Sequence, residues 1–267
     1  MEINDVLIFD TETTGVPERT AQWDLDYKDY PHIVQLAWMF GDKEETHIIF
    51  PDGWEIPDDA VAVHGITTEY AKEHGEPFEY IVDMFIQDCR AAAMICGHNI
   101  HFDTSVIKAN ILREFGWDYY DGNGVESALF KGKRIDTMRP SMKWVDARMA
   151  NGRLKFPRLE ELYARCFPGE TFPAHDALAD VKACARCLPI LVEMGLVELK
   201  IKEYPDAKLP MMGEEKAKAP EAAKNGPNSG AKVSDDKLPI QQEKTPQIED
   251  LTKISDAAAE LLDQNNF

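Results

Sequence analysis

The sequence predicts an α/β fold in which a mixed β-sheet is flanked by helices. Three strand-like segments come early in the chain, and helical and strand-like segments alternate after them. Residues 6–9 form a short, fully apolar run, which is typical of a central strand buried on both faces. Apolar residues recur at helical spacing from Ala177 to Leu191, which predicts a long helix with one buried face.

Each predicted element rests on a local pattern. The strands are short segments rich in apolar residues, at 5–12, 32–40, 46–50, 94–97 and 133–136. The helices are segments with apolar residues at three- and four-residue steps, at roughly 78–92, 104–115, 140–149, 158–166 and 176–195. Pro189 is expected to kink the last helix, because proline cannot donate a backbone hydrogen bond.

Two carboxylates follow the first apolar run, in the fragment IFDTETTG. Alternate side chains of a strand face the same side, so Asp10 and Glu12 can share a metal ion. Gly15 permits a turn after them that leaves the backbone open to a ligand. Taken alone, such a pair is more typical of a solvated strand end.

Two later fragments change that interpretation. Asp103 lies in HNIHFD, and His175 and Asp180 lie in HDALAD, so the five residues are spread over 171 positions. On a continuous helix, side chains five apart point about 140° away from each other. His175 is therefore expected in the loop before a helix that has Asp176 as its N-cap.

Four converging carboxylates need a cation. Asp10, Glu12, Asp103 and Asp180 would repel one another and be costly to desolvate without a strong positive charge among them. Two divalent ions provide that charge, and an all-carboxylate site suits Mg²⁺ or Mn²⁺. His175 could take a proton from the attacking water near neutral pH. The sequence therefore predicts a metal-dependent centre that cleaves phosphodiester bonds.

The three fragments, in this order, resemble the three exonuclease motifs of the DEDDh 3′–5′ exonucleases, over roughly residues 5–195. That family contains the proofreading epsilon subunit of bacterial DNA polymerase III. Residues 63–67 (VHGIT) resemble the HGIT segment of the epsilon-like branch, and residues 134–137 (RIDT) resemble its strand ending in Asp-Thr. The resemblance implies an RNase H-like fold and a place in the subgroup with a histidine in the third motif.

The resemblance also implies a role for each matching residue. The metal ligands would be Asp10, Glu12, Asp103 and Asp180. The general base would be His175. The 3′-terminal nucleotide would lie along the turn after the first strand, with its base near the HGIT-like segment and its phosphate and sugar near the second motif. The substrate-binding residues would thus be Thr13, Thr14, Gly15, His64, Asn99 and Phe102.

The expected activity is metal-dependent 3′–5′ hydrolysis of DNA that releases nucleoside monophosphates, in replication proofreading or repair. Single-stranded or mismatched ends are the expected substrates. An exoribonuclease of the same family is an alternative, because one site can accommodate either sugar. A non-catalytic nucleic-acid-binding or interaction module is a second alternative, and the intact five-residue set argues against it.

Composition limits the class of protein. The chain has 267 residues, is 44% hydrophobic and carries a net charge of −19. That charge argues against a broad surface for duplex binding and suggests that a partner delivers the substrate, or that binding is weak and salt-sensitive. No apolar run is long enough to span a membrane and no signal sequence is evident, so a cytoplasmic protein is expected. The five cysteines show no disulfide pattern, and Cys184 and Cys187 are expected to face the core.

The predicted organisation is an exonuclease domain over residues 1–205 and an acidic tail over residues 206–267. The tail has too little apolar surface to offset its ordering entropy, so most of it is expected to be disordered. Residues 248–262 differ, because apolar side chains recur there at helical steps. This amphipathic segment is expected to bind a DNA polymerase or another replication protein.

Overall fold

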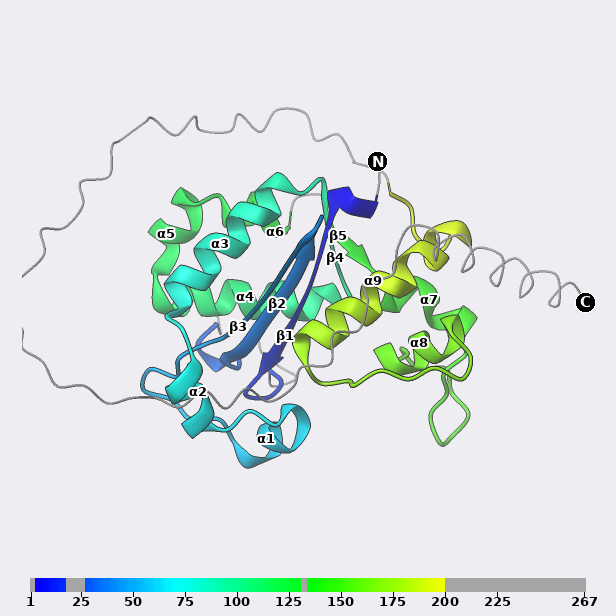
Figure 1. The fold of residues 1–267 in the computed structure, drawn as a ribbon, viewed down its shortest axis with the longest axis horizontal. Helices are drawn as coiled ribbons and strands as arrows, with labels where there is room; N and C mark the ends of the chain where they lie inside the picture. The colour runs from blue at the N-terminus through cyan, green and yellow to red at the C-terminus, as the bar shows by residue number, and fades with distance from the viewer. Residues whose placement is uncertain (1–2, 18–26, 131–133, 200–267) are drawn as a thin grey trace, which may run out of the picture. The chain divides into compact units, whose positions relative to one another are not determined.

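Five strands form one sheet in the order β3-β2-β1-β4-β5, as the computed structural model shows for residues 3–17, 27–130 and 134–199 (Figure 1). The described residues all belong to one compact unit, Met1–Tyr204. The strands are β1 (Val6–Thr13), β2 (Ile33–Phe40), β3 (Lys43–Ile48), β4 (Met94–Gly97) and β5 (Arg134–Asp136).

The sheet is mixed. β1 pairs antiparallel with β2, and β2 pairs antiparallel with β3 in a tight hairpin. On its other edge β1 pairs in parallel with β4, and β4 pairs in parallel with β5. The predicted mixed sheet, its five strands and its RNase H-like arrangement are confirmed.

Helices cover both sides of the sheet, as Figure 1 shows. One side carries α3 to α6 and the other α7 to α9, while α1 and α2 extend beyond one end of the strands. Two short 3₁₀ turns, η1 (Ile3–Asp5) and η2 (Tyr27–Asp29), complete the described elements. The helices are α1 (Asp58–His64), α2 (Thr68–His74), α3 (Phe78–Ala91), α4 (Ile100–Glu114), α5 (Gly116–Gly122), α6 (Val125–Leu129), α7 (Met138–Val145), α8 (Leu159–Cys166) and α9 (Ala177–Glu193).

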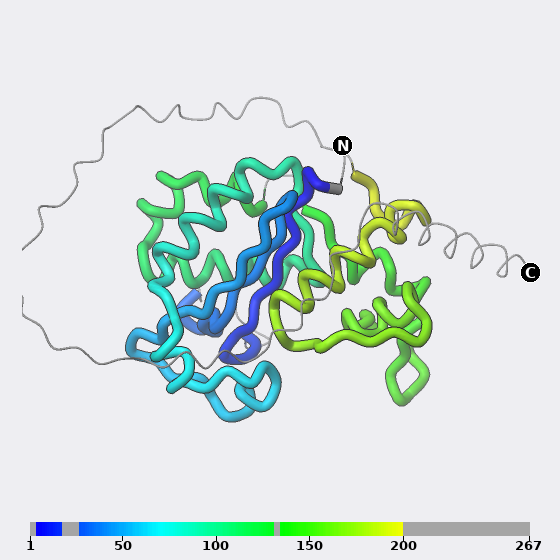
Figure 2. The backbone as a smooth tube through the Cα atoms, in the orientation of Figure 1, coloured from blue at the N-terminus to red at the C-terminus, as the bar shows by residue number. Residues whose placement is uncertain are grey.

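Strand β1 presents its two faces to different layers. Leu7 and Phe9 belong to the main hydrophobic core, together with side chains of α3, α4 and α6. Ile8, Asp10 and Glu12 alternate with them and so face the opposite layer, in which α9 packs along β1 and β2. Figure 2 shows the β1 and α9 segments, far apart in the chain, running side by side. The β1 carboxylates therefore face the helix that carries Asp180.

Three predicted boundaries are corrected. The helix expected from residue 104 begins at Ile100, because Asn99 adopts a left-handed conformation (φ 68°) that turns the chain into it. The helix expected over residues 140–149 ends at Val145, where Asp146 is left-handed (φ 56°). The strand expected at residues 46–50 is β3, which begins at Lys43 because the hairpin pairs it directly with β2.

Helices α1, α2, α5 and α6 were not expected from the sequence. Each has only five to seven residues, too few for a periodic pattern to stand out. Helix α9 continues through Pro189. Cys184 and Cys187 are buried, as predicted.

The predicted tail over residues 206–267, with its segment at 248–262, lies outside the described residues. Within the described ranges, no helix has both the length and the apolar character that a membrane crossing requires.

Candidate active site

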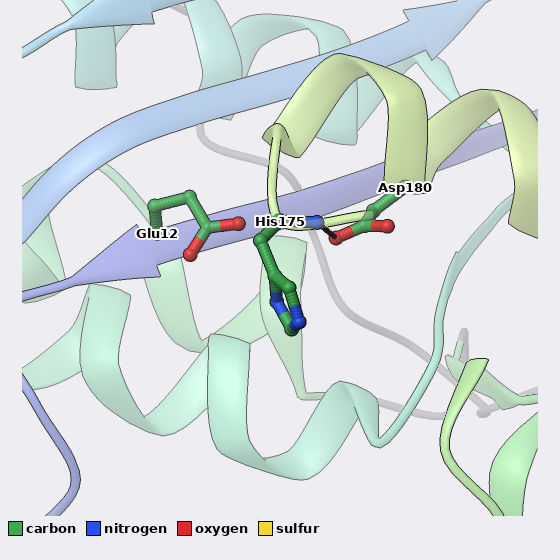
Figure 3. A group of neighbouring side chains, drawn as sticks. All are labelled: Glu12, His175 and Asp180. Atoms are coloured by element: carbon green, nitrogen blue, oxygen red, sulfur yellow. Dashed lines mark hydrogen bonds between the residues drawn. The ribbon is translucent and has the colours of Figure 1, made fainter. Parts of the chain in front are cut away.

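Strand β1 and the start of α9 bring three side chains of the predicted site together. One ligand atom each of Glu12, His175 and Asp180 lies within 4.8 Å of the other two. Figure 3 shows Glu12 on the strand, Asp180 on the helix, and His175 on the loop between their carboxylates. Glu12 is more than 160 residues away from the other two in the chain, so the fold brings it to them.

The loop before α9 has the predicted geometry. Asp176 is the N-cap, and its side chain accepts a hydrogen bond from the backbone N–H of Ala179 at 2.9 Å. His175 precedes it in a left-handed conformation (φ 69°). Its backbone N–H donates to Oδ2 of Asp180 at 3.2 Å. The turn is therefore fixed at both ends, and the imidazole projects from it (Figure 3).

Asp103 approaches from the first turn of α4. Strand β1 continues past Ile8, its last residue paired with β4, so the next part of its edge is open. There Oδ1 of Asp103 accepts hydrogen bonds from the backbone N–H of Thr11 at 3.2 Å and from its hydroxyl at 2.8 Å. This contact holds Asp103 next to Asp10.

Burial raises the pKa of all four carboxylates, and charges within the cluster add to the shifts of Asp10 and Glu12. Burial, followed by the charges of Asp180 and Asp103, raises the pKa of Glu12 to about 8. Burial also raises the pKa of Asp103 and of Asp180 to about 7, although hydrogen bonds from Thr11 and from the His175 backbone oppose the two shifts. The pKa of Asp10 is raised by burial and by the charges of the other three.

Two buried polar atoms at this site have no hydrogen-bond partner within the described part of the chain: Oδ1 of Asp180 and Nε2 of His64. Leaving such groups unpaired is costly. An unpaired carboxylate oxygen beside three further carboxylates is what a cation-binding centre requires, and oxygen ligands suit Mg²⁺ or Mn²⁺. The residues present therefore fit divalent cations.

The raised pKa values predict an unusual pH dependence of stability. These carboxyl groups have ordinary pKa values near 4 when unfolded, so between about pH 4.5 and 8 the folded, metal-free protein binds more protons than the unfolded chain. Its stability should therefore fall as pH rises through that window. In EDTA, calorimetry should show Tm decreasing from pH 5 to pH 8, and Mn²⁺ should raise Tm more at pH 8 than at pH 5.5.

The matched variant for this prediction is Asp180→Asn, which removes the titrating carboxyl group. Its amide oxygen can still accept the hydrogen bond from the His175 N–H. In this variant the metal-free Tm should fall less with pH, and the Mn²⁺ effect should shrink. A Tm that rises between pH 5 and pH 8 in EDTA would show that the carboxylates do not repel one another as inferred.

The imidazole of His175 lies partly in solvent, with 51% of the side chain exposed. Its Nε2 is 3.8 Å from Oε1 of Glu160, at the start of α8. The charge on His175 in turn acts on His64 and lowers its pKa, although burial of His64 is the larger cause. The HGIT-like segment therefore lies beside the third motif.

The predicted substrate-binding residues lie around this centre and make contacts within the chain. The Thr13 hydroxyl donates to the carbonyl of Gly15 at 2.6 Å, and the Thr14 hydroxyl accepts from the His32 N–H at 2.9 Å. Gly15 has φ 152°, a conformation that favours glycine. Asn99 is the N-cap residue of α4, and Phe102 packs half-buried against the main core. Their contacts with a nucleotide stay predictions.

Three residues that position this site were not expected from the sequence. Thr11 binds Asp103, as described above. Gln35 on β2 accepts from the Ala177 N–H at 3.2 Å and so holds the start of α9 on the sheet. Glu160 faces His175. Side-chain alternation along β1 could have shown that Thr11 faces the opposite side from Asp10 and Glu12. No local sequence pattern distinguishes Gln35 or Glu160.

A mixed sheet with four carboxylates and a histidine at one strand end defines a class of phosphodiester-cleaving hydrolases. The comparison with protein families is consistent with this class, because the model described as "RNase_T: Exonuclease" matches residues 7–188. The chain belongs to this exonuclease family, whose members hydrolyse phosphodiester bonds. Among curated proteins, no sequence matches this chain significantly.

Solved structures of exonuclease I share the fold. The enzyme from Methylocaldum szegediense is 19% identical (TM-score 0.51), with 68% of this chain and 40% of that chain covered. A product-bound exonuclease I is 21% identical (TM-score 0.53), and the match covers 72% of this chain and 44% of that chain. The E. coli enzyme in complex with a dA16 oligonucleotide is 22% identical (TM-score 0.52), and the match covers 70% of this chain and 40% of that chain. The chain thus spans well under half the length of these structures.

Proposed function

We propose that the protein is a metal-dependent 3′–5′ exonuclease that hydrolyses the terminal phosphodiester bond of DNA and releases nucleoside monophosphates. The observation that carries this proposal is the convergence of Glu12, Asp180 and His175 within 4.8 Å, beside Asp10 and Asp103, in a chain of the exonuclease family. The raised pKa values indicate that these carboxylates need positive charge when ionised.

Asp10, Glu12, Asp103 and Asp180 would hold two divalent ions, Mg²⁺ or Mn²⁺. When bound, such ions supply Lewis-acid stabilisation of the charge that develops on the phosphate and the leaving oxygen. The protein's own contribution is to fix the carboxylates. Thr11 and the His175 N–H hold Asp103 and Asp180 in place through the hydrogen bonds described above.

His175 acts as the general base in this proposal. Its imidazole takes the proton of the attacking water, and the Glu160 carboxylate lies 3.8 Å from its Nε2. Because the side chain is half exposed, the proton can pass on to solvent after each cleavage. The left-handed backbone of His175 accompanies a ring position within 4.8 Å of the Glu12 and Asp180 carboxylates.

DNA is the favoured substrate in this proposal, with an epsilon-like role in proofreading or repair. E. coli exonuclease I has been solved with dA16 and dT13 oligonucleotides, and the HGIT-like segment of this chain places His64 beside the site. A replication protein bound through the tail and a cytoplasmic location remain parts of the proposal. An exoribonuclease activity is the alternative for the same centre.

The test is cleavage of labelled strands of one sequence in Mg²⁺ or Mn²⁺. Single-stranded DNA and mismatched 3′ ends should be shortened faster than matched duplex, because a paired terminus must first be opened at a cost of about a few kcal/mol. RNA should be the poorer substrate, and EDTA should stop all cleavage. RNA shortened more than about ten times faster than DNA, roughly 1.4 kcal/mol in barrier, would favour the exoribonuclease. Absence of any 3′ shortening would reject the proposal.

A further inference from the structure

Positive charge is concentrated in one part of this acidic protein. From Arg134 to Arg165 the chain has eight Lys or Arg residues against four Asp or Glu residues, whereas the whole chain carries a net charge of −19. This segment comprises β5, α7, the loop after it and α8. The overall acidity therefore conceals a local basic surface.

Five exposed basic residues of this segment are together named the basic rim: Arg139, Lys143, Arg148, Arg153 and Arg158. Arg139 and Lys143 are four apart on α7 and so share one face of that helix. Lys143 and Arg153 form no ion pair with any described residue. The rim thus carries positive charge that the fold does not neutralise.

Both ends of the rim segment are linked by contacts to residues of the catalytic centre. At one end Arg139 pairs with Asp136 at 3.3 Å, and Asp136 accepts from the backbone N–H of Asn99 at 3.1 Å. Asn99 precedes α4, whose first turn carries Asp103. At the other end Arg158 is two residues before Glu160, which faces His175. In Figure 1, α7 and α8 lie next to α9, which carries the third motif.

An aromatic ring lies within the rim. Phe156 is 47% exposed, and the Arg139 guanidinium lies 5.2 Å from its ring centroid. Cationic side chains beside an exposed aromatic ring are typical of surfaces that bind single-stranded nucleic acid, because phosphates pair with the cations and a base stacks on the ring.

We propose that the basic rim binds the sugar–phosphate backbone of a single strand whose 3′ end occupies the catalytic centre. This inference rests on the proposed function and assigns the rim to nucleotides farther from the cleaved end. A strand suits the rim better than an acidic protein, because contacts of Asp136 and Glu160 link both ends of the segment to the centre proposed to bind the terminal phosphate. It also explains how a protein of net charge −19 can hold a polyanion.

The test is binding of a fluorescent dT20 strand to the full chain in EDTA, followed by anisotropy across a salt series. The doubly changed variant Lys143→Glu/Arg153→Glu should raise Kd at least tenfold. Its slope of log K against log salt should be shallower than wild type by about 1.4, since each lost phosphate contact removes about 0.7 for a single strand. Lys143→Gln/Arg153→Gln should also raise Kd and make the slope shallower, but by less than the double Glu variant does. Phe156→Ala should raise Kd and leave the slope in place.

The matched control is Arg90→Glu, which removes an exposed arginine near the end of α3 and should leave Kd and slope as in wild type. Equal Kd and slope for all rim variants and wild type would overturn the inference. So would a polyglutamate peptide that binds as tightly as dT20, since the rim would then be a general anion surface. Because binding is measured without metal, its outcome is separate from that of the cleavage assay.

Discussion

Asp180→Asn is expected to nearly abolish cleavage while leaving the fold intact. The substitution keeps the shape of the side chain and an oxygen that can accept from the His175 N–H. It removes the negative charge that, together with the unpaired Oδ1, supports the proposed role of the residue as a cation ligand. Without this ligand the cation would be misplaced. Hydrolysis would then fail, because it depends on where the positive charge of the cation lies.

The companion variant is Asp10→Ala, which removes a carboxylate whose pKa is raised by burial and by the charges of the other three. Asp118→Asn, an exposed carboxylate on α5, is the control and should keep wild-type activity. Steady-state cleavage of labelled single-stranded DNA in Mg²⁺ measures all three. Retention of more than about a tenth of wild-type kcat/KM by Asp180→Asn, a loss below roughly 1.4 kcal/mol, would remove Asp180 from the ligand set.

His175→Ala should lower kcat by about 10²-fold or more, the usual effect of losing a general base. Cation binding should persist, because the four carboxylates remain. The rise in Tm produced by Mn²⁺ at pH 8 should therefore stay close to that of wild type. Loss of that rise would instead indicate that His175 is itself a cation ligand. A ring atom of His175 lies close enough to Glu12 and Asp180 for that role.

Chemical rescue sharpens the same experiment. The His175 side chain is 51% exposed, so imidazole in solution can reach the space left by His175→Ala. Added imidazole should then restore part of kcat. His74→Ala, which removes an exposed imidazole on α2, should behave as wild type. Activity of His175→Ala within a few-fold of wild type would exclude the residue as the base.

The sequence predicted the strands and the loop position of His175 well, because both follow from short-range patterns. An apolar run followed by Asp-Thr-Glu predicts a buried strand with carboxylates toward its end. A spacing of five forces His175 off the helix that bears Asp180. The start of α4 was misjudged because it depends on the left-handed backbone of Asn99, which side-chain periodicity does not reveal.

The supporting contacts were out of reach for a different reason. Gln35 holds the Ala177 N–H across 142 positions of the chain, and Thr11 holds Asp103 across 92. Such pairs form only when distant elements meet, so no local pattern encodes them. The basic rim was overlooked because the net charge sums the whole chain and hides an opposite local balance.

The pairing of β1 with α9 also has a consequence for synthesis on the ribosome. Glu12 leaves the ribosome first, and Asp180 follows 168 residues later. At ~5–20 residues per second, the interval between them is on the order of ten seconds or more. A nascent chain lacks part of the ligand set throughout that time. A nuclease assembled in this order becomes active only when its domain is almost fully translated, which protects the nucleic acids around the ribosome from premature digestion.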